Sequence, residues 1–263
     1  MDTATSLQAI DTQLDSLTER AYQVFGSYRV KRLNDVCTVC CIDKEAHSRL
    51  LAVAPYGLSC EDLSLYATAA FASQPDSPDE FKYFLPRYLE LLKDFESPCI
   101  PEVTFKRLKQ YRAVEEWPDD ELSLLNDFAS ALFAKALSNY PLRGDFMYLA
   151  DLLVMFDNGD FDTAPLLVQW QESKCDTALL HLKDLVLDSF NVKKGYRLDK
   201  GFASAQLSDT VMNWITANRD LFCEQLERYV AFGDFEGEDE WLLDELSWTY
   251  EALKYHFNPS SEA

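Results

Sequence analysis

The chain has 263 residues, of which 45 are acidic and 24 are basic, so its net charge is −21. Hydrophobic residues make up 48% of the chain, which is enough to bury a core and argues against intrinsic disorder. A surface this negative repels nucleic acids and anionic membranes and attracts basic proteins, so we expect no nucleic-acid and no membrane partner.

Compartment signals point to the cytoplasm. The first 20 residues contain neither a basic region nor the apolar stretch of a secretory signal, and no long uncharged apolar window follows. Seven cysteines, an odd number at uneven spacings, fit reduced thiols better than a disulfide framework. We therefore expect a cytoplasmic protein.

Apolar residues recur every three or four positions along most of the chain, which predicts an all-α fold. Residues 27–42 break this period and predict a short strand or a packed loop, whereas Asp43 and Ser59 are predicted helix caps. Pro86 predicts a kink or a break in its helix. The predicted helices lie at about 5–25, 43–53, 59–73, 78–95, 106–112, 117–139, 145–156, 163–172, 175–190, 204–217, 219–231 and 238–256.

Short connections between about eleven helices indicate antiparallel hairpins, arranged as an irregular bundle or a short solenoid-like stack. We expect a single helical domain, 1–263. Its one candidate boundary lies near 141–160, between an N-terminal helical part with the cysteine loop (1–140) and an acidic C-terminal helical part (160–263). The segment "DNGDFD" lacks the spacing of a calcium loop and predicts a turn, with Asn158 and Gly159 at positive φ.

The segment "CTVCC" places three cysteines within five residues. Cys37 and Cys40 have the spacing of a zinc knuckle, and Cys41 and His47 are further ligand candidates, but a second knuckle is missing. A redox pair is an alternative, although the βαβ context of such pairs is absent. The sequence favours a third interpretation, in which these cysteines are small apolar residues buried in a tight loop. His181 lies on a strongly apolar helix and is predicted to be a core histidine.

The acid-rich segment "FGDFEGEDEWLLDE" interleaves carboxylates with aromatic residues and contains no base. Charge of this kind steers a basic protein, and aromatic side chains can anchor it. The alternative is an acidic helix start with its aromatics in the core. The predicted partner-binding residues are Asp234, Phe235, Glu236, Glu238, Asp239, Glu240 and Trp241.

Several blocks in order, "CTVCC", "YGLSCEDLSLYATAAF", "DEFKYFLPRYLELL", a short basic helix and "WPDDELSLLNDFASALF", resemble a group of uncharacterised, acidic, helical bacterial proteins. The most specific block is "FKYFLPRYLEL", and the resemblance covers about residues 37–135. The resemblance implies a small acidic cytosolic partner of a secreted toxin, that is, an immunity protein. The C-terminal half carries none of this resemblance.

Together these observations favour a binding protein over an enzyme: a cytosolic, immunity-type inhibitor whose acidic surface occludes a basic partner, such as a toxin domain. One alternative is a metal-dependent enzyme that uses the region of Cys37, Cys40 and His47, with zinc as its cofactor. The other is a helical scaffold or adaptor with a groove for a peptide.

Overall fold

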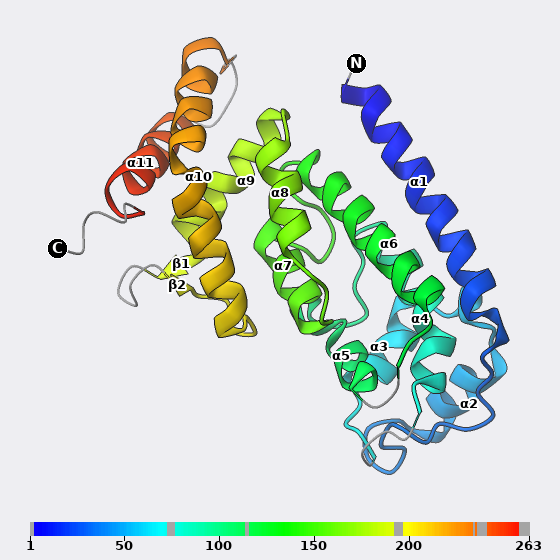
Figure 1. Ribbon diagram of the computed structural model, residues 1–263. Helices are drawn as coiled ribbons and strands as arrows, with labels where there is room; N and C mark the ends of the chain where they lie inside the picture. Colours follow the sequence, from blue (N-terminus) through cyan, green and yellow to red (C-terminus); the bar gives the residue numbers. More distant parts are fainter. Residues whose placement is uncertain are drawn as a thin grey trace.

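The computed structural model describes residues 3–72, 77–113, 116–191, 197–233, 235 and 241–257. These residues form eleven α-helices and one two-stranded antiparallel sheet, which confirms the predicted all-α fold (Figure 1). None of the described helices combines the length and the apolar character needed to cross a membrane.

The α-helices are α1 (Thr3–Val24), α2 (Lys44–Ala52), α3 (Cys60–Thr68), α4 (Asp79–Leu92), α5 (Lys106–Arg112), α6 (Asp119–Leu137), α7 (Leu149–Asn158), α8 (Ala164–Glu172), α9 (Asp176–Asp188), α10 (Ala205–Phe232) and α11 (Leu242–Tyr255). Three short 3₁₀ helices are η1 (Phe25–Ser27), η2 (Pro55–Gly57) and η3 (Pro101–Val103). The strands β1 (Phe190–Asn191) and β2 (Arg197–Leu198) were not predicted, and they pair Phe190 with Leu198.

Helix α1 lies on one side of the molecule and α11 on the other, α2, α3 and α5 gather at the lower end of the view, and α6 returns to lie beside α1 (Figure 1). Helix α1 packs along α4 and α6, and α7 lies in the middle against α5, α6, α9 and η3. Helices α10 and α11 pack on each other and on α9. The hydrophobic core is one cluster that runs through all of these layers, from Leu14 to Phe257.

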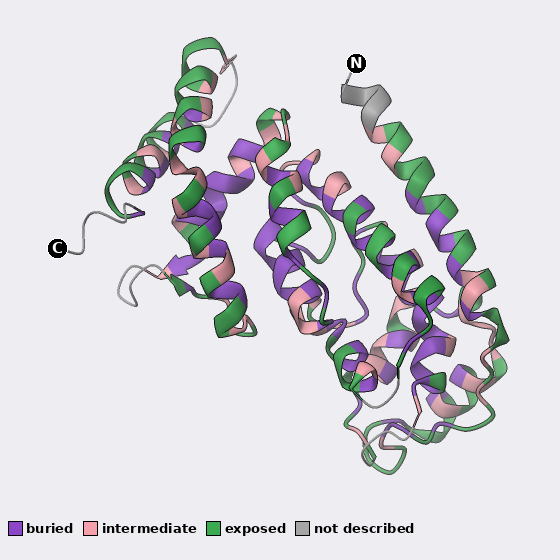
Figure 2. Cartoon of the chain, viewed as in Figure 1, coloured by how far each residue is buried: buried purple, intermediate pink, exposed green. Residues whose placement is uncertain are grey.

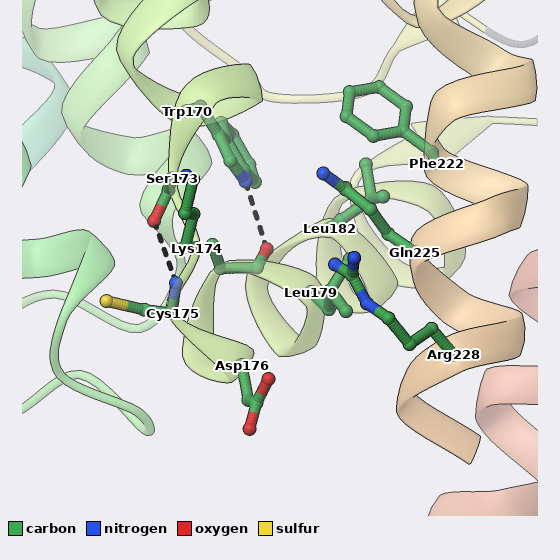
Figure 3. A pocket seen from close by; sticks show the side chains of 11 residues that line it. Trp170, Ser173, Lys174, Cys175, Asp176, Leu179, Leu182, Phe222, Gln225 and Arg228 are labelled. Atoms are coloured by element: carbon green, nitrogen blue, oxygen red, sulfur yellow. Dashed lines mark hydrogen bonds between the residues drawn. The ribbon is translucent and has the colours of Figure 1, made fainter. Parts of the chain in front are cut away.

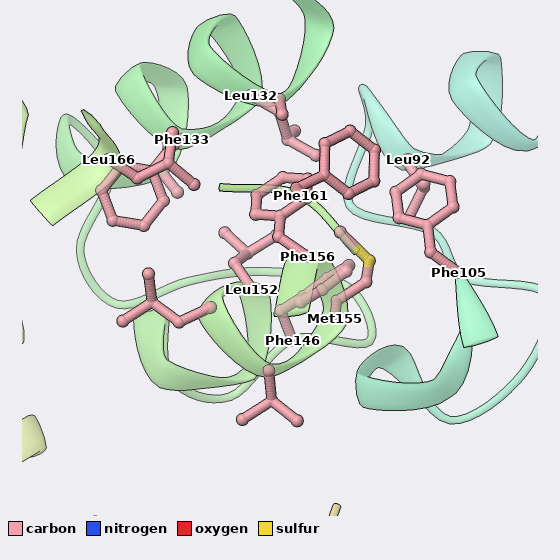
Figure 4. Packing of buried hydrophobic residues seen from close by; sticks show 14 of the residues in the cluster. Leu92, Phe105, Leu132, Phe133, Phe146, Leu152, Met155, Phe156, Phe161 and Leu166 are labelled. Carbon is pink, nitrogen blue, oxygen red and sulfur yellow. The ribbon is translucent and has the colours of Figure 1, made fainter. Parts of the chain in front are cut away.

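Helix α7 is the centre of this core. Every residue from Leu149 to Phe156 is buried, so the helix has no solvent-facing side (Figure 2). Its side chains pack with buried residues of neighbouring segments, including Phe133 of α6, Phe105 directly before α5, and Phe161 in the connection after α7 (Figure 4). A helix that is apolar around its whole circumference is stable only when neighbours cover every face.

Local capping chemistry explains where two of the helices begin. The Asp43 carboxylate accepts the backbone N–H of Ala46 (2.8 Å) at the start of α2, as predicted. Ser59 and Asp62 form a reciprocal capping box at the start of α3. Helix α3 ends at Thr68, five residues before its predicted end.

Three local expectations were wrong or incomplete. The two helices expected at 204–217 and 219–231 are one helix, α10, and the Asn218 side chain donates to the carbonyl of Trp214 inside it (2.9 Å). Helix α4 continues through Pro86 without a break. In the turn after α7, Asp160 carries the positive φ of 63° and Gly159 has a φ of −88°.

A buried ion pair joins α4 to α6. The Lys82 ammonium lies 2.8 Å from the Glu121 carboxylate, and their side chains are only 1% and 4% exposed. The Tyr28 hydroxyl donates to the same carboxylate (2.6 Å), and Lys82 lies 4.3 Å from the centre of the Trp117 ring. Two charges this deeply buried are tolerated because each has a partner of opposite charge and further polar or aromatic contacts.

We predict that Lys82→Met lowers the free energy of unfolding by about 3–5 kcal/mol, because it leaves the Glu121 carboxylate buried without its cation. The double variant Lys82→Met/Glu121→Leu should recover most of this loss, since it removes both charges. Urea unfolding followed by circular dichroism measures both.

The matched control is Arg20→Met, because Arg20 and Asp127 form a solvent-exposed pair at 3.6 Å. Its expected cost is below about 1 kcal/mol. A double variant no more stable than Lys82→Met would contradict the argument that the unpaired charge causes the loss.

Candidate functional site

An apolar groove lies between the end of α10 and the first half of α11. Its volume is about 570 Å³. The buried side chains of Leu226 and Leu246 form its floor, and the half-exposed side chains of Val230 and Leu243 form its walls. The groove is therefore a preformed apolar surface open to solvent.

One hydrogen bond crosses this groove: the Tyr250 hydroxyl of α11 donates to the Glu227 carboxylate of α10 (2.7 Å). It raises the pKa of Tyr250, because the phenolate form would face that carboxylate. Glu227 also places a negative charge at the edge of an otherwise apolar surface. The bond ties the two helices together beside the opening.

A row of aromatic side chains occupies another face of α11. Trp241, Trp248 and Tyr255 recur every seven residues, which places them along one side of the helix. They are 57%, 51% and 61% exposed. Phe232, at the end of α10, is more exposed still. Large aromatic side chains left in contact with water are typical of surfaces that bind other proteins.

The predicted partner-binding segment lies between these two helices. Asp234, Glu236, Glu238, Asp239 and Glu240 lie outside the described residues. Phe235 is half-buried, and its ring packs edge-on against Tyr229 at 5.3 Å, so this aromatic residue faces the protein. Trp241 directly precedes α11 and is exposed. The segment as a whole stays a prediction.

Sequence reasoning missed the groove and most of the aromatic row. The seven-residue recurrence of Trp241, Trp248 and Tyr255 was a signal that could have found the row. The groove had no such signal, because Val230 and Leu243 look like ordinary core positions of two helices. Only the packing of α10 against α11 shows that these side chains remain partly exposed.

The second candidate is the cysteine loop, which lies at the other end of the molecule, just before α2. The sulfur atoms of Cys37, Cys40 and Cys41 lie within 4.8 Å of one another, with 3.3 Å between the first two and 3.7 Å between the last two. Cys40 and Cys41 are exposed, so the expectation of a buried loop filled by cysteines was wrong. His47 is not part of this group among the described residues.

The turn shifts the pKa values of the Cys37 and Cys40 thiols in opposite directions. The pKa of Cys37 falls to about 6, chiefly because the backbone N–H of Cys40 points at its sulfur, with smaller contributions from the Cys40 thiol and the N–H of Val39. The pKa of Cys40 rises to about 11, because its proton is held between the sulfurs of Cys37 and Cys41.

Both ends of the cysteine loop are fixed in the protein. Before the loop, Val36 is buried and pairs with Phe71 in an isolated β-bridge, and the N–H of Cys37 donates to the carbonyl of Ala70 (2.7 Å). After it, Ile42 is buried and Asp43 caps α2. The β-bridge only partly matches the short strand expected here. Because both anchors face the core, the tip between them faces outward.

A buried carboxylate holds the segment before the loop. The Glu80 side chain, at the start of α4, accepts the backbone N–H groups of Asn34 (2.7 Å) and Asp35 (3.3 Å). Burial raises the pKa of Glu80 to about 7, assisted by the nearby Asp35 carboxylate and opposed by the two N–H donors. Ionisation of Glu80 is therefore coupled to the stability of this region.

Two other features do not form a site. His181 is a buried core residue, as predicted: its Nε2 lies 3.0 Å from the carbonyl of Ala136 and 2.9 Å from that of Asn139, and burial lowers its pKa. The cavity between α8, α9 and α10, where Trp170 donates to the carbonyl of Ala178, is about 20 Å³ (Figure 3). That volume holds about one water molecule.

No family model matches the chain, and neither the curated proteins nor the solved structures include a match. A functional conclusion therefore rests on the groove, the aromatic row and the cysteine loop alone.

We predict that Glu80→Gln stabilises the protein at pH 8 and has little effect at pH 4.5. Since the pKa of Glu80 is about 7 in the folded state and 4.5 is its ordinary value, the folded state binds the proton more tightly. Stability from this group is complete below pH 4.5 and is lost as the pH rises to 7. The expected gain at pH 8 is on the order of 2–3 kcal/mol.

Urea unfolding at several pH values between 4.5 and 8 measures this difference. Glu19→Gln is the control, because Glu19 is exposed on α1. A difference between Glu80→Gln and wild type that does not change with pH would show that the pKa of Glu80 is the same in the folded and unfolded states, and would contradict the raised pKa.

Proposed function

We propose that this protein is a cytoplasmic binding protein of the immunity type, which inhibits a basic protein partner by covering its surface. The observation that carries the proposal is the apolar groove between α10 and α11, located in the most acidic part of the chain. Fold and chemistry support this function better than an enzymatic one, because the groove offers apolar contacts and one tyrosine–glutamate pair.

The charge around the groove supports a basic partner. Residues 201–263 contain 13 acidic and 3 basic side chains. Two of the three bases are engaged locally, since Arg219 pairs with Asp220 (3.0 Å) and Lys254 lies 5.3 Å from the centre of the Tyr250 ring. Lys183 of α9 also pairs with Glu245 of α11 (2.7 Å), so the acid excess of this end is offset only in part. The remaining excess favours the approach of a positively charged protein.

The shape of the surface supports a helical segment as the part of the partner that binds. A groove between two helices accepts the apolar face of a third helix, with side chains at i, i+4 and i+7 as its anchors. Leu226 and Leu246 would meet these anchors at the floor, and Glu227 would meet a basic side chain at the rim. We therefore propose an amphipathic, lysine- or arginine-rich helix as the bound element.

We predict that a synthetic amphipathic helix with a leucine face and a lysine face binds the protein, and that the same peptide with glutamate in place of lysine does not. Val230→Gln/Leu243→Gln should weaken binding of the basic peptide about tenfold or more, because it removes two half-exposed apolar anchors. Fluorescence anisotropy of the labelled peptide measures both, and added salt should weaken binding further.

The control variant is Met147→Gln, since Met147 is an exposed apolar residue that does not line the groove. Equal binding of the basic and acidic peptides would contradict the role of charge. Equal affinity of wild type and the groove variant would contradict the role of the groove. In cells, we expect wild type to capture a basic protein that the groove variant does not capture. If that partner is an enzyme, we expect this protein to inhibit it in a one-to-one complex.

A further inference from the structure

The cysteine loop is not used by the proposed binding function, and it is far from the groove. It is also the one place among the described residues where three or more cysteine, histidine or acidic side chains gather closely enough to hold a metal ion. We propose that Cys37, Cys40 and Cys41 form a site for one thiophilic d¹⁰ metal ion, with Zn²⁺ as the expected occupant. The inference is independent of the proposed function.

The spacing of the sulfur atoms fits a single ion. A zinc ion bound to thiolates at about 2.3 Å in a tetrahedron holds its sulfur ligands about 3.8 Å apart. The observed separations are 3.3 Å between Cys37 and Cys40 and 3.7 Å between Cys40 and Cys41, with all three sulfurs inside 4.8 Å. Changes of no more than about 1 Å in the sulfur separations would therefore place the three sulfurs on one face of a tetrahedron.

The loop is held in place before an ion binds. The N–H of Cys37 donates to the carbonyl of Ala70 (2.7 Å) at one end, and the buried Ile42 anchors the other end, so little ordering is required when an ion binds.

The ligand set determines the kind of ion and the kind of site. Thiolates are soft ligands that select zinc and copper(I) over magnesium or calcium. Three thiolates leave the fourth position of a tetrahedron open, and no described residue supplies a fourth ligand within the group. Because Cys40 and Cys41 are exposed, that position faces solvent and is accessible to water or to a ligand from another molecule.

The experiment is a competition titration of the reduced full-length protein with Zn²⁺ in the presence of a chromophoric chelator, without oxygen. We expect one ion per chain. Cys37→Ser, Cys40→Ser and Cys41→Ser should each weaken binding by more than about 100-fold, beyond the 10–100-fold typical of outer-shell residues. Circular dichroism checks that each variant remains folded, since these positions are at the surface of a loop.

Two controls locate the site. His47→Ala and Cys175→Ser should bind Zn²⁺ as wild type does, because neither residue belongs to the group. Titration with Cd²⁺ provides a second readout, since the thiolate-to-metal charge-transfer absorbance grows with the number of sulfurs bound. Wild type should show the absorbance of three sulfurs, and each loop variant that of two.

Several results would overturn the proposal. The first is that the reduced protein binds much less than one Zn²⁺ ion per chain. The second is that Cys41→Ser binds Zn²⁺ as well as wild type does. The third is that His47→Ala weakens Zn²⁺ binding as much as the cysteine variants do. Failure of the reduced protein to bind, together with ready formation of a Cys37–Cys40 disulfide in air, would identify a redox pair in place of a metal site. None of these outcomes bears on peptide binding at the groove.

Discussion

The complete burial of α7 is the constraint on which the rest of the structure depends. A ten-residue helix with eight consecutive buried residues has to be covered on every side, and the chain supplies the covers from both directions. The preceding segments contribute η3, α5 and α6, and the following ones contribute α9. Even the single carboxylate in this buried stretch is satisfied: Asp151 accepts the N–H groups of Met147 and Tyr148 and pairs with Lys200 at 2.8 Å. The peripheral helices α1, α10 and α11 add their own buried residues to the same core and keep their outer faces exposed to solvent.

Local chemistry made much of the fold predictable. The caps at Asp43 and Ser59 use side chains within three residues of their targets, so sequence alone locates them. The errors arose where a residue's role depends on distant contacts. Gly159 was expected at positive φ, yet its φ is negative, and a Cβ there would lie 2.7 Å from atoms of Phe105 and Phe161. Glycine is needed at this position for close packing, while the positive φ is carried by Asp160, a residue type that tolerates it.

The polar interior and the candidate sites were harder to predict, for the same reason. Lys82 and Glu121 are 39 positions apart, and only the packing of α4 near α6 gives each its partner. The cysteine spacing was visible in the sequence, but its exposure was not: buried anchors on both sides of the loop direct the tip toward solvent. In the C-terminal region the charge excess was evident from composition. The half-exposure of Val230 and Leu243 was not, because it depends on how closely α10 and α11 approach.

Charge and groove complement each other at the α10–α11 end. Screening limits attraction between exposed charges to about 10 Å at moderate salt, so the acid excess can guide a partner but cannot hold it in one orientation. Apolar contact acts only at short range and depends on shape, and the groove provides it through Leu226 and Leu246. The bond from Tyr250 to Glu227 fixes the two helices and leaves a carboxylate at the opening. A partner that is only basic would bind weakly and lose affinity with salt, whereas one that is only apolar would arrive slowly. The surface is therefore selective for a partner with both properties on one helix face.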